Sequence, residues 1–194
     1  MFRDFHPSVS RWLPIATTVV IAWGCTSPNP AFPDGMTDVD LGPTPSFTLS
    51  RNGLAHRVEL EHPGLHVVMN AAGVLALLGE TGFDLDCAIA GLREFGGVRR
   101  RFEVKARVGG ISIVDDYAHH PTEVASTIEA ARTMTNGHLW VVFQPHRYTR
   151  TAGLAPAFGA PLTGADRVIV TDVYGAGEQP QPGVTGRLVE EAVR

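Results

Sequence analysis

The stretch DDYAHHPTEV, residues 115–124, places two carboxylates, a phenol and two imidazoles directly before a predicted helix start. The apolar run before it, Ile111–Val114, is typical of a short buried strand, and the Pro and Glu inside it are typical of a helix N-terminus. Asp116 is therefore predicted at the carboxyl end of a strand. Ligands of open α/β sheets bind at that edge, because loops and helix N-termini converge there.

Two simpler interpretations apply to the same residues. Asp116 and His120 could only cap the following helix, since short polar side chains favour that position. The adjacent His119 and His120 could suggest zinc, but adjacent side chains diverge and no histidine or cysteine lies four residues further on. Capping does not use every polar group of the stretch, and no metal ligand is predicted.

A second polar cluster follows a second apolar run. The run Leu139–Phe143 leads into QPHRYTRT, residues 144–151. The segment between the two clusters, Pro121–Met134, has Val124 and Ile128 at helical spacing. A strand, a helix and a strand in this order are typical of a parallel crossover.

A third apolar run, Arg167–Val173, again ends in polar and glycine-rich sequence. Because parallel strands end at a common edge, we expect the loops carrying Asp116, Arg147 and Asp172 to emerge side by side from one sheet. The predicted fold class is α/β, with a Rossmann-like parallel sheet.

The preceding part of the chain has signals for a smaller α+β unit. Ser46–Ser50 and His56–Leu60 are predicted to form a hairpin about Asn52-Gly53, a dipeptide that favours tight turns. Two helices are predicted after it, at Val68–Leu78 and Asp84–Glu94.

The first 45 residues allow two interpretations. An apolar segment before Cys25, with arginines upstream, faintly resembles a lipoprotein export signal, but it is too short to span a bilayer. A strand at Ile15–Trp23 is favoured instead. Ser27–Pro45 is rich in Pro, Gly and Asp, so it is predicted to be a loop or disordered.

Five motifs together resemble the Mur ligase family, and within it the UDP-N-acetylmuramate:L-alanine ligases. They are HxxxNA at 66–71, RRRFE at 99–103, VDDYAHHPTEV at 114–124, FQPHRYTRT at 143–151 and DVYGAGEQPQPG at 172–183. The tripeptide-recycling ligases share the DDxAHHPT element but are less similar at QPHRYTRT. The resemblance implies three parts: a poorly defined or disordered stretch at 1–45, the tail of a central ATP-binding domain at 46–104, and a truncated C-terminal ligase domain at 105–194.

The resemblance also implies a reaction. In the family, ATP phosphorylates the carboxylate of UDP-N-acetylmuramate, L-alanine attacks the acyl phosphate, and Mg²⁺ neutralises the phosphates. The implied catalytic residues are Arg101, Asp116 and His119, and the implied nucleotide-binding residues are Asn70, Arg101 and Asp116. Those implied to face the muramoyl carboxylate and alanine are Tyr117, His146, Arg147 and Arg150.

Ordinary structural roles remain open for several of these residues. The arginines at 99–101 could be a solvated charge run, Asn70 a polar residue at a helix start, and Arg147 with Arg150 a surface pair. A guanidinium nevertheless suits phosphate, and an amide can both donate to and accept from a nucleoside.

The chain also departs from the family. It has no glycine-rich phosphate loop ending in Gly-Lys-Thr or Gly-Lys-Ser, its only lysine is Lys105, and Val67 stands where the family has an asparagine. We therefore expect a fragment that does not ligate alone. The alternatives are a non-catalytic binding module acting with a separate chain that supplies the loop, or an exported degenerate protein.

Charge and cysteine content narrow the setting. The formal net charge is −4 without a large basic cluster, so no nucleic-acid partner is predicted, and no membrane partner is predicted either. Cys25 and Cys87 form no disulfide framework, which fits the cytoplasm.

Overall fold

The computed structural model describes residues 35–194, and within that range no helix is long and apolar enough to cross a membrane. The predicted export signal and the predicted strand at Ile15–Trp23 lie outside the described residues. The described part contains two apolar cores, each built from its own set of strands and helices.

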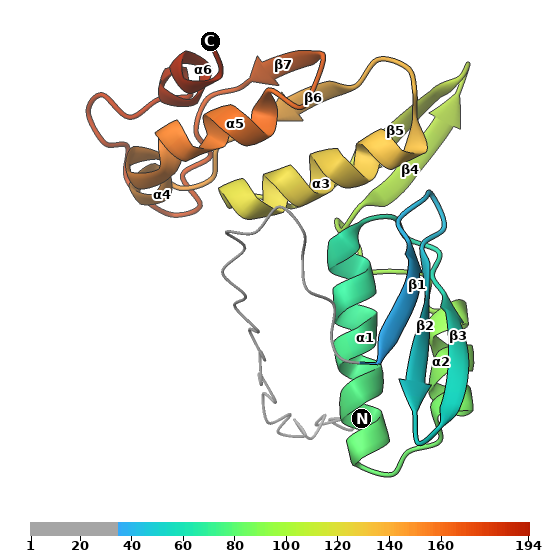
Figure 1. Ribbon diagram of the computed structural model, residues 1–194. Helices are drawn as coiled ribbons and strands as arrows, with labels where there is room; N and C mark the ends of the chain where they lie inside the picture. Colours follow the sequence, from blue (N-terminus) through green and yellow to red (C-terminus); the bar gives the residue numbers. More distant parts are fainter. Residues whose placement is uncertain (1–34) are drawn as a thin grey trace, which may run out of the picture. The chain divides into compact units, whose positions relative to one another are not determined.

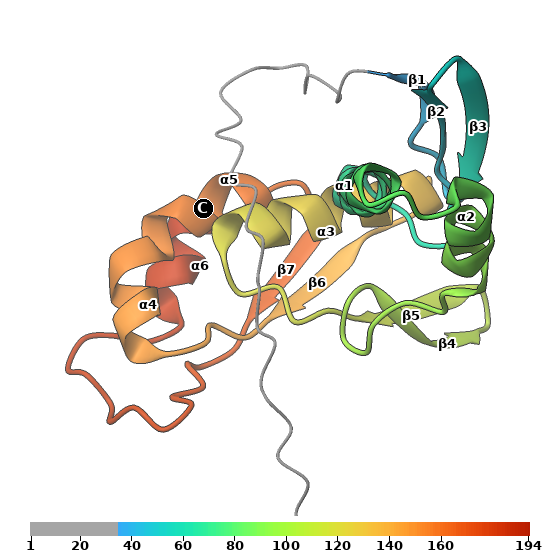
Figure 2. The same cartoon turned by 90° about the horizontal axis from the view of Figure 1, so that it is seen from below.

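The first core lies under an antiparallel sheet. The sheet has the order β1 (Met36–Asp40), β2 (Ser46–Arg51) and β3 (Leu54–Glu59), and it is followed by α1 (Leu65–Glu80) and α2 (Leu85–Glu94). Figure 2 shows α1 and α2 on the same side of this sheet. The most buried side chains between them are those of Phe47, Val58, Val68 and Leu75.

Local sequence signals explain these elements. The β2–β3 turn is at Asn52 and Gly53, whose φ angles of 51° and 77° are those a tight hairpin needs, so the predicted hairpin is confirmed. Helix α2 begins where Asp84 accepts a hydrogen bond from the Cys87 N–H at 2.9 Å. Helix α1 extends the predicted helix by about a turn at its start.

Strand β1 corrects one prediction. Met36–Asp40 lies inside the stretch predicted to be loop or disordered, yet it pairs with β2 and buries Met36 in the first core. The register shifts between Thr37 and Asp40, and Asp38 has a φ of 50°. The Pro- and Gly-rich composition indicates turns correctly, but it does not show that a short strand between them has a partner.

The second core contains the parallel pair β6 (Trp140–Phe143) and β7 (Arg167–Val170), which confirms the α/β fold class. The helices of this part are α3 (Pro121–Met134), α4 (Tyr148–Leu154), η1 (Ala155–Phe158), α5 (Gly159–Leu162) and α6 (Arg187–Val193). Phe143, Phe158, Leu162 and Val189 form its centre. The crossover helix predicted from Pro121 to Met134 is therefore confirmed.

The parallel pair is covered on one face only by the described residues. In Figure 2, α3 and α5 lie on one side of β6 and β7, and no helix of residues 35–194 lies on the other. The outward side chains of Trp140, Val142 and Ile169 are 64%, 68% and 49% exposed.

A separate hairpin, β4 (Glu103–Val108) and β5 (Ile111–Asp115), connects the two cores along the chain (Figure 1). The prediction that β5 is a buried strand of the parallel sheet is wrong: β5 pairs antiparallel with β4, and Ile111 and Ile113 are 65% and 54% exposed. The cause is the Gly109-Gly110 turn, whose φ angles of 56° and 79° fold β4 back onto β5.

Candidate ligand-binding site

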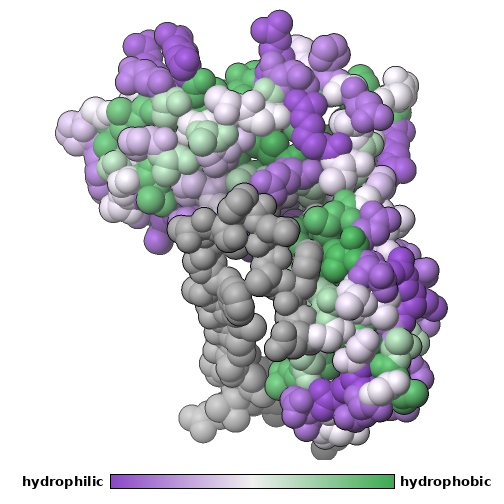
Figure 3. All heavy atoms as spheres, in the orientation of Figure 1, coloured by the Kyte–Doolittle hydropathy of each residue, from purple (hydrophilic) through white to green (hydrophobic). Residues whose placement is uncertain are grey.

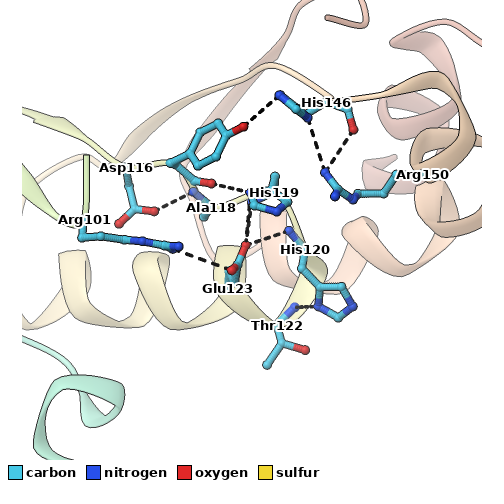
Figure 4. Close-up of polar contacts among 10 residues, drawn as sticks. Arg101, Asp116, Ala118, His119, His120, Thr122, Glu123, His146 and Arg150 are labelled. Atoms are coloured by element: carbon cyan, nitrogen blue, oxygen red, sulfur yellow. Dashed lines mark hydrogen bonds and ion pairs between the residues drawn. The ribbon is translucent and has the colours of Figure 1, made fainter. Parts of the chain in front are cut away.

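The site begins at the N-terminus of α3 (Figure 4), where a capping box fixes the backbone. The His120 side chain accepts a hydrogen bond from the Thr122 N–H at 3.3 Å. Glu123 Oε2 accepts from the N–H groups of His119 at 2.9 Å and His120 at 3.1 Å. The capping role considered for His120 is therefore confirmed, and these bonds use the donors that a helix start leaves unpaired.

Asp116 does not cap α3. Its Oδ2 accepts from the Phe102 N–H at 2.8 Å and its Oδ1 from the Ala118 N–H at 2.7 Å. Phe102 is buried with a φ of 47°, a region that bulky residues rarely occupy. The Asp116 carboxylate therefore holds the segment before β4 in a strained conformation against the loop after β5.

A cavity of about 690 Å³ brings together the residues implied to bind the nucleotide. Asn70, Arg101 and Asp116 all line it, with His66 and Glu123 beside them. Arg101 Nη1 lies 3.7 Å from Glu123 Oε1, and half of the Arg101 side chain is exposed. The rest of the wall is mostly apolar and includes Val67, Ala71, Val74, Phe95 and Val98. Figure 3 shows a green, hydrophobic patch over the upper end of α1.

A second group of side chains joins the loops after β5 and β6. The Tyr117 hydroxyl lies 2.9 Å from His146 Nε2, and the two rings meet edge to face at 5.4 Å. His119 Nδ1 lies 2.7 Å from the Tyr117 carbonyl oxygen, so it donates to that oxygen. The two predicted clusters therefore meet, although β5 is not part of the parallel sheet.

Cations surround His146. Burial lowers its pKa, and the positive charges of Arg150, His119, Arg147 and Arg100 lower it further, so the neutral imidazole is favoured. Arg150 Nη1 lies 3.3 Å from the His146 carbonyl oxygen and 3.5 Å from Nδ1. Among residues 35–194, no carboxylate lies within ion-pair distance of Arg150.

Arg147 is placed differently. It begins α4 with a φ of 75°, and its Nε lies 3.7 Å from Glu178 Oε1. Glu178 also accepts from the Thr149 N–H at 2.9 Å and from the Thr149 hydroxyl at 2.7 Å. Arg147 does not line the cavity that contains Asp116. The two loops lie together, but these two side chains do not meet.

Three polar residues of the site were not predicted from the sequence as site residues: His66, Glu123 and Glu178. Glu123 has a local signal, because it stands three residues after the N-cap His120. His66 lies inside the HxxxNA motif, although no role followed from it. Glu178 has none, since it meets Arg147 only through the fold. In the described range, no group of three His, Cys, Asp or Glu side chains is arranged to hold a metal ion.

Comparison with known proteins identifies the class. Residues 100–194 match the family model described as Mur ligase, glutamate ligase domain, and the chain belongs to the Mur ligase family. Its similar relatives are alanine-adding members. The UDP-N-acetylmuramate--L-alanine ligase of Clavibacter sepedonicus is 48% identical over 165 residues, which are 84% of this chain and 35% of that protein. That of an Anaeromyxobacter species is 38% identical over 189 residues, 97% of this chain and 41% of that protein.

A solved structure agrees with these relatives. The UDP-N-acetylmuramate-alanine ligase of Thermotoga maritima superposes with a TM-score of 0.66 at 30% identity, over 81% of this chain and 34% of that one. The chain thus spans well under half the length of the relatives it matches.

Proposed function

We propose that this chain provides the alanine-binding part, and the tail of the nucleotide-binding part, of an ATP-dependent ligase that joins L-alanine to UDP-N-acetylmuramate in peptidoglycan precursor synthesis. The alanine-ligase names of the relatives support this substrate pair. The proposed location is the cytoplasm, where ATP and nucleotide-linked precursors are present.

The observation that carries the proposal is the position of consecutive residues. Asp116 lines the cavity with Asn70 and Arg101, while the next residue, Tyr117, bonds to His146 in the second cluster. One short, hydrogen-bonded segment thus connects a cavity suited to a nucleotide with a cation-rich surface suited to carboxylates. A ligase that activates a carboxylate with ATP needs these two sites next to each other.

The side chains divide the work by charge. Arg101 points its guanidinium toward Glu123 at the polar end of the cavity, where phosphate oxygens would be the stronger partner. Arg150 keeps donors available for a substrate carboxylate, because its own contacts are only to His146. His146 is favoured in its neutral form, so it can hold the Tyr117 hydroxyl without adding charge.

No Mg²⁺ role is assigned to the described residues. Mg²⁺ prefers oxygen ligands, but both Asp116 oxygens and Glu123 Oε2 already accept backbone hydrogen bonds. The sequence also lacks a phosphate loop. In this proposal, the loop and the metal ligands come from other polypeptide, in the same chain or in a separate one.

Calorimetry tests the proposal. We expect millimolar ADP and L-alanine each to give a binding heat with the chain, and no phosphate release when ATP and both substrates are supplied to it alone. Arg101→Ala should weaken ADP binding about tenfold, and Arg150→Ala should weaken L-alanine binding by a similar factor. Arg167→Ala, a change on the exposed face of β7, is the matched control. No heat with either ligand would reject the proposal.

A further inference from the structure

His66 has an unusual setting in the cavity wall. It lies in the first turn of α1, and one edge of its ring lies against Gly64 and Ala130 of α3. A Cβ on Gly64 would come within 2.7 Å of His66 Cε1 and 3.0 Å of the Ala130 Cβ. Gly64 also has a φ of 109°, which favours glycine. The backbone therefore makes room for this imidazole.

The two ring nitrogens of His66 differ in environment. Nδ1 is buried and has no hydrogen-bond partner among the described residues. Nε2 makes no hydrogen bond with residues 35–194 either, but it is not among the buried atoms, so it stays accessible. A buried N–H without an acceptor is costly, so the proton belongs on Nε2.

The charge state agrees with this tautomer. Burial lowers the pKa of His66, and Arg101 lowers it further against the opposing effects of Asp116 and Glu129. The imidazole is therefore neutral at pH 7, with one N–H that is free for a partner in the cavity.

The neighbouring groups leave this donor without competition. The Asp116 oxygens both accept backbone N–H groups, and Val67, the next residue along α1, offers no hydrogen bond. The apolar wall beside His66 suits a flat ring rather than a phosphate, whereas Arg101 suits the phosphates.

We propose that the His66 Nε2–H recognises the nucleoside of the bound nucleotide, donating to an uncharged acceptor such as a purine ring nitrogen or a ribose oxygen. This inference rests on the proposed function of the cavity as a nucleotide site. It makes His66, together with Asn70, the polar recognition element of the apolar wall.

Two measurements test this inference. The first is ¹⁵N NMR of the histidine-labelled chain, with no substitution: we expect His66 as the neutral Nε2–H tautomer at pH 7, with an Nε2 shift change on ADP addition. The second compares variants by ADP titration. His66→Phe keeps a ring but removes the donor, and should weaken ADP binding five- to tenfold. His66→Gln can place an amide N–H near the Nε2 position and should bind within about threefold of the unchanged chain.

The outcomes separate the two proposals. A cationic or Nδ1–H imidazole, or ADP binding equal in His66→Phe and the unchanged chain, overturns the role of His66 and leaves the nucleotide cavity standing. Absence of ADP binding to the unchanged chain overturns the nucleotide cavity itself, and the His66 assignment with it. His138→Phe, at an exposed loop position, is the matched control and should bind ADP as the unchanged chain does.

Discussion

The two polar clusters, residues 115–124 and 144–151, look alike in composition but differ in how their groups are bonded. In the first, the carboxylates of Asp116 and Glu123 accept four backbone hydrogen bonds. In the second, Arg150 touches only His146 among the described residues. The first cluster therefore sets geometry, and the second keeps donors free for a ligand.

The strongest way to break this contrast is to remove the Asp116 carboxylate. Asp116→Ala leaves the Phe102 and Ala118 N–H groups without acceptors, and we expect the free energy of unfolding to fall by about 2–4 kcal/mol. Urea denaturation measures it. Asp115→Ala is the control, because its 3.7 Å pair with Arg100 is partly exposed and should contribute under about 1 kcal/mol. Equal effects would contradict the scaffold role of Asp116.

Glu123→Gln should act in the same direction but less strongly, by about 1–2 kcal/mol, because it weakens the capping box. Burial raises the pKa of Glu123, but the hydrogen bonds from His119 and His120 outweigh it, and the net pKa lies below the ordinary 4.5. A lowered carboxyl pKa stabilises the fold above pH 4.5, and this stabilisation is lost as the pH falls through the folded-state pKa. Thermal unfolding between pH 3 and 6 should show this step, and Glu123→Gln should lack it.

The second cluster is sharpened by the titration of His146. Its folded-state pKa lies below the ordinary 6.5, so the unfolded chain binds the proton more readily and stability should fall as the pH drops below 6.5. Arg150→Gln removes a neighbouring positive charge, and the pKa of His146 should rise toward 6.5 in an NMR titration. Arg167→Gln should leave it unchanged. A His146 pKa that does not respond to Arg150 would contradict the proximity described above.

The smallest expected effect concerns the exposed face of β6 and β7. Val142→Thr should change the free energy of unfolding by less than about 0.5 kcal/mol, because its side chain is 68% exposed. Val141→Thr, on the inward face of the same strand, should cost more, since Val141 packs against the second core. Urea denaturation compares the two. Sedimentation should also show less self-association in the Val142 variant.

Local signals predicted much of this molecule, and pairing across the chain limited the rest. The Asn52-Gly53 turn and the Pro121 helix start depend on residues next to each other, and both were correctly predicted. The grouping of Asn70, Arg101 and Asp116 in one cavity agrees with their implied common role.

Predictions failed where a partner is distant in sequence. The apolar run Ile111–Val114 does not show whether its neighbour will be β4 or β6. Arg147 meets Glu178 only because α4 and the glycine-rich loop fold together. The free Nε2 of His66 depends on the packing of Gly64 and Ala130 around the ring, which no sequence pattern indicates.

The most direct test of the central claim is an NMR map of ADP binding to the ¹⁵N-labelled chain. We expect the largest shift changes at Asn70, Arg101 and Asp116, because these residues line one cavity. Changes confined to the exposed strand face at Trp140 and Ile169, or no changes at millimolar ADP, would contradict the account.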